Sequence, residues 1–296
     1  MSISRFASKL SLPQRNPGVT TVLEYLVVRF GGISPDVWRQ RIADGKVHWH
    51  DGTRITAQTA YRPQQRVYYY REVSAEASVP FVERIIYRDA DLLVARKPHF
   101  LAVTPGGVHV NECLQSRLRD KTGIDSLQVL HRLDRLTAGL VMCSLNPATR
   151  HHYHRLFATR TITKTYRAVA RVSADNDLVG RQWELKNRIV VGEPRFRMQV
   201  APGVANSHSV IRCLRQHGDL AEFELNPVTG KTHQLRVHMH ALGWPILHDS
   251  LYPDVQPERD EHYERPLQLA AVSLRFVDPV TQLDRHFTCE ANLIRE

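Results

Sequence analysis

The stretch from His131 to Leu140 holds the side chains best suited to chemistry in this 296-residue chain. Its one carboxylate, Asp134, lies between Arg132 and Arg135, and an apolar run follows at 140–142. A surface cluster of salt bridges rarely leads straight into a buried strand. Nearby cations favour the ionised form of an aspartate, and the same cations can hold phosphate groups. The pattern indicates an ionised carboxylate placed beside an anionic substrate.

Two later segments carry polar side chains at suggestive spacings. Lys164 and Tyr166 are two residues apart, so a strand would place both on one face. Residues 228–238 read VTGKTHQLRVH and contain Lys231 and Arg236. An aspartate between arginines is more often a salt bridge of little energetic value, and a tyrosine in a strand is more often a core residue. On residue types alone these structural roles stay open.

Short strands and a few helices must position these residues. We expect strands at 84–87, 92–95 and 163–172, a helix at 147–157, and strands or short helices at 221–225, 234–240 and 273–277. Such a mixture predicts an α+β domain. We assign it to residues 81–296, and no solenoid-type repeat is present in the sequence.

A compact basic module is expected at residues 20–75, after a loosely ordered lead at 1–19. We expect a helix at 21–28, a second helix that starts at Ser34, and a strand at 67–70. Strands at 47–49 and 54–56 are expected to form a hairpin around an Asp-Gly turn. On the second helix Trp38 and Ile42 share one face, whereas Arg39 and Arg41 point elsewhere. The stretch 72–80 is the expected linker.

Charge is concentrated in this module. Residues 1–75 contain eleven Lys and Arg against five Asp and Glu, which gives +6 of the net +10 of the whole chain. Basic side chains with aromatic neighbours are expected of an RNA-binding surface, and Arg39, Arg41 and Lys46 are our candidate contacts. For the aromatic side chains themselves, burial in a small core is favoured over base stacking.

Composition limits the class of protein. The chain is 42% hydrophobic and 24% charged, which is ordinary for a globular protein. No apolar stretch approaches membrane length, and the first residues do not resemble a signal peptide. Four scattered cysteines without a CxxC pair indicate reduced thiols, so we expect a cytoplasmic protein without disulfides.

Five blocks in this order resemble the RluA family of pseudouridine synthases: 131–140, 164–169, 228–238, 243–252 and 266–271. The similarity begins near Arg84 and includes the pattern IIYRDADLLVARKP at 85–98. It implies a catalytic domain built on a mixed, mainly antiparallel sheet with flanking helices and loops. More weakly, residues 36–51 resemble the S4-like RNA-binding module often attached to these enzymes.

The resemblance implies that the chain isomerises uridine to pseudouridine in a structured RNA. Asp134 matches the family's catalytic aspartate, and Arg236 the arginine that pairs with it. Tyr166 would lie beside the base and could remove the C5 proton, with help from a neighbouring cation because a phenol has a pKa near 10. Whether Asp134 attacks C1′, adds to C6 or removes a ribose proton stays open.

Substrate contacts follow from the same resemblance. Arg132 matches a position that fills the gap left by a flipped uridine, which must leave the stack to react. The further candidate contacts with RNA are Arg135, Lys164, Lys231 and Leu269. We expect a monomer that acts on large-subunit ribosomal RNA, or otherwise on transfer RNA. The reaction is redox-neutral, so no cofactor is expected.

Some residues depart from the family pattern. Ala138 stands where serine is common, Ala270 where histidine is frequent, and Lys231 where arginine is common. His248 stands where glycine is usual, so the turn at 247–249 is expected to differ. None of these changes removes a candidate catalytic residue.

Two alternative functions are compatible with parts of the sequence. The 16 histidines invite a zinc hydrolase, but neither HExxH nor CxxC occurs, so no metal site is expected. A catalytically silent RNA-binding or ribosome-assembly protein would explain the basic module. The presence of Asp134, Tyr166 and Arg236 argues against it.

Overall fold

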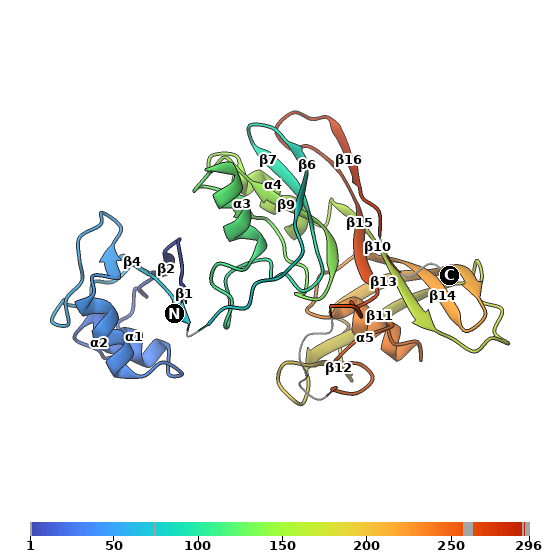
Figure 1. The fold of residues 1–296 in the computed structure, drawn as a ribbon, viewed down its shortest axis with the longest axis horizontal. Helices are drawn as coiled ribbons and strands as arrows, with labels where there is room; N and C mark the ends of the chain where they lie inside the picture. The colour runs from blue at the N-terminus through green and yellow to red at the C-terminus, as the bar shows by residue number, and fades with distance from the viewer. Residues whose placement is uncertain (1, 74, 257–262, 292, 294–296) are drawn as a thin grey trace. The chain divides into compact units, whose positions relative to one another are not determined.

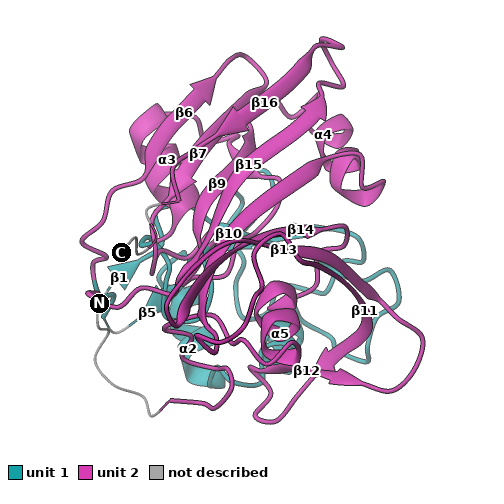
Figure 2. Cartoon of the chain, turned by 90° about the vertical axis from the view of Figure 1, so that its right-hand side faces the viewer, with its two compact units in different colours: residues 1–77, 105–112 teal, residues 78–104, 113–296 magenta. Residues whose placement is uncertain are grey.

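The computed structural model describes residues 2–73, 75–256, 263–291 and 293. The chain divides into two compact units, shown in Figures 1 and 2. Unit 1 comprises residues 1–77 and 105–112, and unit 2 comprises residues 78–104 and 113–296. The expected ranges 1–19, 20–75 and 81–296 contain residues that lie outside the described part of the chain, among them the end residues Met1 and Glu296.

The segment 105–112 was expected within the larger domain but belongs to unit 1. Its anchor is the carboxylate of Glu76, which accepts hydrogen bonds from the backbone N–H groups of Val110, Asn111 and Glu112 at 2.6 to 2.9 Å. Because these partners are 34 to 36 residues from Glu76, no local pattern in the sequence could indicate them.

Unit 1 packs two helices against a three-stranded sheet. Its elements are β1 (Ser2–Ile3), β2 (Ser8–Ser11), α1 (Val22–Arg29), α2 (Pro35–Ala43), β3 (Val47–Trp49), β4 (Arg66–Tyr69) and β5 (Glu72–Val73). Thr21 and Glu24 form a capping box at the start of α1, and Ser34 caps α2 ahead of Pro35. Trp38, Leu26 and Val67 are fully buried in the core between the helices and the sheet.

Three expectations for unit 1 need correction. The described part of the expected lead, residues 2–19, is not loosely ordered throughout, because β1 pairs with β5 and β2 pairs with β4. The stretch 54–56 does not form a full strand, because Thr56 is held in a turn by Thr59. The expected hairpin is nevertheless present in part: the Trp49 amide donates to the Thr53 carbonyl at 2.8 Å, and the Ile55 amide donates to the Val47 carbonyl at 3.1 Å. β3 also pairs with β4. The linker is shorter than expected, because 72–73 belong to β5.

Unit 2 is built on one large sheet. Its strands are β6 (Arg84–Arg88), β7 (Leu92–Lys97), β8 (Gln128–Val129), β9 (Ala138–Ser144), β10 (Thr163–Arg171), β11 (Gln182–Val191), β12 (Met198–Ala201), β13 (Ser207–His217), β14 (Leu220–Pro227), β15 (Leu269–Val277) and β16 (Asp284–Thr288). Its helices are α3 (Leu114–Thr122), α4 (Arg150–Ala158) and α5 (Gln234–Ala241). The order is β12-β11-β13-β14-β10-β15-β9-β7-β6, with β16 beside β15 and β8 beside β9. Among the described residues only β9 and β15 pair in parallel, so the expected mixed, mainly antiparallel sheet is confirmed.

Most expected elements of unit 2 are present. The ambiguous stretch 234–240 is the helix α5, and 221–225 lies within the strand β14. No helix among the described residues is long and apolar enough to cross a membrane.

Gly139 sets the distance between β9 and β15. Its φ angle is +117°, and a Cβ atom placed there would lie 2.2 Å from the carbonyl oxygen of Ala271. Ala138 and Ala270 pair next to this contact, so two of the departures from the family pattern are direct neighbours. Only glycine fits this close approach, and the approach fixes the strand that follows Asp134.

Candidate active site

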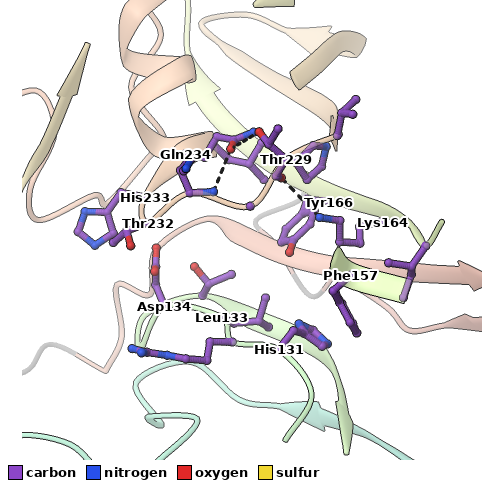
Figure 3. Close-up of a pocket in the computed structure, with 18 of the residues that line it drawn as sticks. His131, Leu133, Asp134, Phe157, Lys164, Tyr166, Thr229, Thr232, His233 and Gln234 are labelled. Atoms are coloured by element: carbon purple, nitrogen blue, oxygen red, sulfur yellow. Dashed lines mark hydrogen bonds between the residues drawn. The ribbon is translucent and has the colours of Figure 1, made fainter. Parts of the chain in front are cut away.

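A pocket of about 750 Å³ opens in unit 2. Its walls come from the segment before β9, from the end of α4 and the start of β10, and from the loop between β14 and α5 (Figure 3). These segments lie far apart in the sequence but meet because β10 is hydrogen-bonded to both β14 and β15, and β15 to β9. Asp134, Tyr166 and Arg236 all line this pocket.

Asp134 sits in the turn that leads into β9. Its backbone carbonyl accepts a hydrogen bond from the Thr137 amide at 3.0 Å, which closes the turn. The side chain of Asp134 is 28% exposed to solvent, and its carboxylate lies 3.5 Å from Nη1 of Arg236. The pairing of Asp134 with Arg236, which are 102 residues apart, is therefore present in the structure. The carboxylate is held by one cation and remains open to the pocket.

Arg236 has a second and tighter carboxylate partner. Its Nε and Nη2 atoms donate to the two oxygens of Asp249 at 2.7 and 2.6 Å. Both side chains are buried, with exposures of 3% and 0%. Burial alone lowers the pKa of the Arg236 guanidinium, but the hydrogen bonds and charge of Asp249 outweigh it and raise this pKa. Asp249 thus fixes the guanidinium and leaves Nη1 for Asp134.

Asp249 was not among the candidate site residues predicted from the sequence. It lies in the block 243–252 that carried the family resemblance, but nothing in its spacing showed that it faces Arg236. His248, just before it, has a φ angle of +62°. This left-handed conformation is the one that favours glycine. His248 therefore adopts the backbone conformation that glycine would take most easily at this turn.

Tyr166 reaches the pocket from β10 and packs between the two main cores of unit 2. Figure 3 shows its ring facing the same space as Asp134. Burial, and then the charge of Asp134, raise the pKa of the Tyr166 hydroxyl. Help from a neighbouring cation would lower this pKa, whereas burial and the charge of Asp134 raise it. The free protein holds Tyr166 as a neutral phenol.

The expected RNA contacts of unit 2 fall into two groups. Arg132 and Lys231 are exposed where they line the pocket, and Lys164 and Leu269 lie deeper in its wall. The ammonium group of Lys164 donates to the Thr229 carbonyl at 3.5 Å, and burial lowers its pKa. Arg135 does not line the pocket.

Lys97 supports the turn that carries Asp134. Its side chain is fully buried, and Nζ donates to the backbone carbonyls of Pro98, Leu101 and Arg135 at 2.6 to 2.9 Å. Burial lowers the pKa of this ammonium well below its usual value. Lys97 was part of the resembling pattern at 85–98, but its contact with Arg135 is visible only in the folded chain.

Gln234 organises the opposite wall. Its Oε1 accepts from the Thr229 hydroxyl at 2.7 Å and from the Lys231 amide at 3.0 Å, and its Nε2 donates to Ser209 at 2.8 Å. These bonds hold the loop 229–233 at the start of α5 (Figure 3). Gln234 has a structural role here that the sequence analysis did not foresee.

The three candidate RNA contacts of unit 1 differ from one another. Arg39 is exposed and pairs with Asp36. Arg41 does not point away from the core as expected, because it lies over the Trp38 ring and pairs with Glu72 at 3.1 Å. Lys46 pairs with Asp44 and Glu72 at 2.8 and 2.5 Å. In this conformation Arg41 and Lys46 are engaged inside unit 1.

Histidines do not gather into a metal site in the described part of the chain. No group of three His, Cys, Asp or Glu side chains there is placed to hold a metal ion. His131 accepts a hydrogen bond from the Met142 amide at 3.0 Å and stacks on Phe157. His151 and His152 are exposed on α4.

Comparison with known proteins gives consistent matches. The family model described as RNA pseudouridylate synthase matches residues 91–241. The dual-specificity RNA pseudouridine synthase RluA of Yersinia pestis is 30% identical over 212 residues, which cover 70% of this chain and 98% of that protein. The ribosomal large subunit pseudouridine synthase C of Vibrio cholerae is 31% identical over 225 residues, covering 71% and 66% of the two chains.

A solved structure has the same fold. The human RNA pseudouridylate synthase domain containing 1 aligns with a TM-score of 0.58 and 26% identity, over 74% of this chain and 88% of that one. The family match includes Asp134, Tyr166 and Arg236 but does not reach residues 1–77. The S4-like assignment of unit 1 therefore stays a prediction.

Proposed function

The chain belongs to the RluA family of RNA pseudouridine synthases, and on that premise we propose that it modifies uridines of large-subunit ribosomal RNA, with transfer RNA as the second candidate. The reaction class follows from the family: the chain is an isomerase that acts on RNA. The choice of target is supported by the Vibrio cholerae relative, whose name specifies the large ribosomal subunit. The Yersinia pestis relative is named as having dual specificity.

One observation carries the assignment of the active site. The Asp134 carboxylate lies in the pocket beside Tyr166 and is paired with a guanidinium that Asp249 holds in place. Isomerisation breaks the N1–C1′ bond, forms a C5–C1′ bond, removes one proton from C5 and gives one to N1. Breaking the first bond builds positive charge at C1′ or requires a covalent partner, and a close carboxylate serves either need. We assign this role to Asp134.

The other pocket residues are assigned by position. Arg236 is proposed to orient the Asp134 carboxylate through the contact at Nη1. Tyr166 is proposed to lie beside the uracil and to remove the proton from C5. Because the hydroxyl is neutral in the free protein, this role requires that the bound substrate lower the pKa of Tyr166. Arg132, at the exposed rim, is proposed to fill the gap left by the flipped uridine. Lys164 and Lys231 are proposed to contact RNA phosphates, and Leu269 to pack against the uracil. Arg135 is also proposed to contact a phosphate of the RNA, outside the pocket.

For unit 1 we propose an S4-like RNA-binding module within residues 20–75. Its net positive charge supports this role. Arg39 is the most accessible of its three candidate contacts, because Arg41 and Lys46 are engaged with Glu72.

Mapping pseudouridine in RNA from a strain that lacks the gene tests the target. We expect one or a few sites in large-subunit ribosomal RNA to lose pseudouridine, and purified protein to restore them on the unmodified RNA. Loss confined to transfer RNA would favour the second candidate. If wild-type protein restores no site in either RNA, the proposed targets are wrong.

A further inference from the structure

The three-stranded sheet of unit 1 carries a row of aromatic rings on the face away from its core. Tyr68 stacks on His48 with ring centroids 5.5 Å apart and planes at 13°, and on His50 at 5.7 Å and 29°. Tyr70 lies 6.1 Å from His48 and extends the row. Nδ1 of His50 is also 3.0 Å from the Tyr68 hydroxyl. We call His48, His50, Tyr68 and Tyr70 the aromatic row.

Strand alternation explains this placement. Successive side chains of a strand point to opposite faces. On β4, Val67 is fully buried whereas Tyr68 is half-buried, and on β3, Trp49 is buried whereas His48 is half-buried. The aromatic residues of unit 1 therefore divide into a core set and a solvent-facing set. The sequence analysis had favoured burial for these aromatics as a group.

Unpaired cations lie on the same face. Lys9 is directly opposite Tyr68 in the register of β2 and β4. Arg66 is two residues before Tyr68 on β4, and Arg54 forms a backbone bridge with His48. All three are exposed, and within the described residues none of them pairs with a carboxylate. Arg39, Arg41 and Lys46 all have such partners, so the free cations of this sheet border the aromatic row.

We propose that this face binds single-stranded RNA, with an unpaired base stacked on the exposed His50 end of the aromatic row and the flanking phosphates held by Lys9, Arg54 and Arg66. Aromatic rings interleaved with cations are what an unpaired strand requires, because every base has a π-face and every nucleotide a negative charge. A base inside a duplex keeps its faces covered by its neighbours, so duplex RNA gains only the charge contacts. The proposal rests on the assignment of RNA as the substrate of the chain.

Binding of labelled RNA to the full-length protein tests this surface. The probes are a ten-nucleotide single strand and the same strand in a duplex, measured by fluorescence anisotropy. Tyr68→Ala removes the ring that supports His50, on which the base stacks. We expect it to raise the Kd for the single strand about tenfold, the loss typical of one stacked base, and to change the Kd for the duplex less than threefold. Tyr68→Phe keeps the ring and should stay within twofold of the wild type. Val28→Ala removes an exposed apolar side chain elsewhere on unit 1 and is the control.

A second variant tests the same surface in case Tyr68→Ala misfolds. His50 is exposed at the end of the row, so His50→Ala should preserve the fold and still raise the Kd for the single strand at least threefold. A single strand that carries 4-thiouridine should crosslink to peptides with residues 48–50 or 66–70. If both alanine variants bind the single strand within twofold of the wild type and no crosslink maps to these peptides, the proposal is overturned.

Failure of the RNA-binding proposal can be distinguished from failure of the proposed function. These measurements use an RNA strand that is bound but need not be modified, so they do not depend on turnover. Absence of pseudouridine formation by the wild type would reject the proposed targets and leave the binding result standing. Unchanged binding by both alanine variants and no crosslink to these peptides, with normal modification by the wild type, would reject only this surface.

Discussion

Two carboxylates share the single guanidinium of Arg236. Asp249 takes Nε and Nη2 in a bidentate pair with no exposure to solvent, and Asp134 meets the remaining Nη1 at 3.5 Å while staying open to the pocket. Charge-assisted bidentate pairs of this kind are strong and directional. The same cation therefore orients Asp134, and the two carboxylates have different tasks because one is buried and one is accessible.

Asp134→Asn should reduce turnover more than about 10³-fold, because the amide offers neither a nucleophile nor a negative charge to the reacting sugar. Affinity for RNA should change less than about twofold, since the contacts with phosphates remain. Release of tritium from C5-labelled uridine measures turnover, and anisotropy measures binding. Asp175→Asn, an exposed change on unit 2, is the control. Full activity of Asp134→Asn would refute the assignment.

Asp249→Asn tests the proposed positioning role. Removing one charge of a buried pair leaves Arg236 partly uncompensated, so stability should fall by about 3 kcal/mol. Turnover at a temperature where the variant stays folded should drop at least tenfold, with little change in the Kd for RNA. Asp249→Glu, which restores the charge, should recover part of the turnover. Unchanged turnover in a folded Asp249→Asn variant would assign Asp249 to stability alone.

Tyr166→Phe tests the role of the hydroxyl. Because burial and the charge of Asp134 raise the pKa of Tyr166, the free protein keeps this group neutral through the physiological range. If the hydroxyl takes part in the proton step, the variant should lose about 10² to 10⁴ in C5 tritium release and keep its affinity for RNA. The wild-type rate should show no rising limb from phenol ionisation below pH 10. A limb near pH 9 that disappears in the variant would contradict the raised pKa.

At the scale of elements, the parallel contact between β9 and β15 fixes the strand that follows Asp134. Gly139 lets the backbones meet, and Lys97 holds the preceding turn through the carbonyl of Arg135. Asp134 is thus placed by a strand pairing on one side and by a buried ammonium group on the other. Gly139 is therefore needed for the packing of the two backbones, which its position in the sequence did not show.

Gly139→Ala should therefore destabilise unit 2 by more than about 2 kcal/mol. The added methyl group would meet a backbone carbonyl, which cannot move aside like a flexible side chain, and the φ angle of +117° is strained for alanine. Urea unfolding measures the loss. Gly230→Ala, where no atom lies within 4 Å of the added Cβ and φ is ordinary, should cost less than about 1 kcal/mol. Equal effects of the two changes would contradict this explanation.

At the scale of the whole molecule, buried neutral histidines make stability depend on pH. Burial lowers the pKa of His131 to about 3 and that of His238 to about 4. In the unfolded chain both would titrate near 6.5. The contribution of these two histidines to the free energy of unfolding is complete above pH 6.5 and is lost as pH falls toward 4. In this range the histidines bind protons in the unfolded state but stay neutral in the folded state.

We expect the free energy of unfolding to fall by about 2 kcal/mol per buried histidine between pH 7 and pH 5. Carboxylates with lowered pKa values, such as Glu72, add their own loss only near and below pH 4.5, so this window isolates the histidines. Urea unfolding across the window measures the slope. His238→Gln should flatten the slope, whereas exposed His152→Gln should leave it unchanged. A flat wild-type profile would contradict the burial of neutral histidines.

Local chemistry determined much of what the sequence could predict. Local signals located the helices that begin at Val22 and Pro35 and the strands β6, β7 and β10, because such signals act over a few residues, whereas β11, β12, β13 and β16 were not predicted. The ordered blocks around Asp134, Tyr166 and Arg236 gave the family and hence the reaction. The stretch 234–240 stayed ambiguous, because a short apolar run fits a strand or a helix equally well.

Tertiary structure decided what depends on distant partners. The roles of Asp249 and Lys97 depend on contacts with residues distant in the sequence. The same holds for the placement of 105–112 in unit 1. The spacing of residues in the sequence does not indicate such contacts. The direction of the pKa shift of Tyr166 depended on burial against two cores and on Asp134, which a sequence cannot measure. The split of the aromatic residues of unit 1 depended on which strand face meets the core. In each case the physical cause is burial or a long-range contact, and both exist only once the chain has folded.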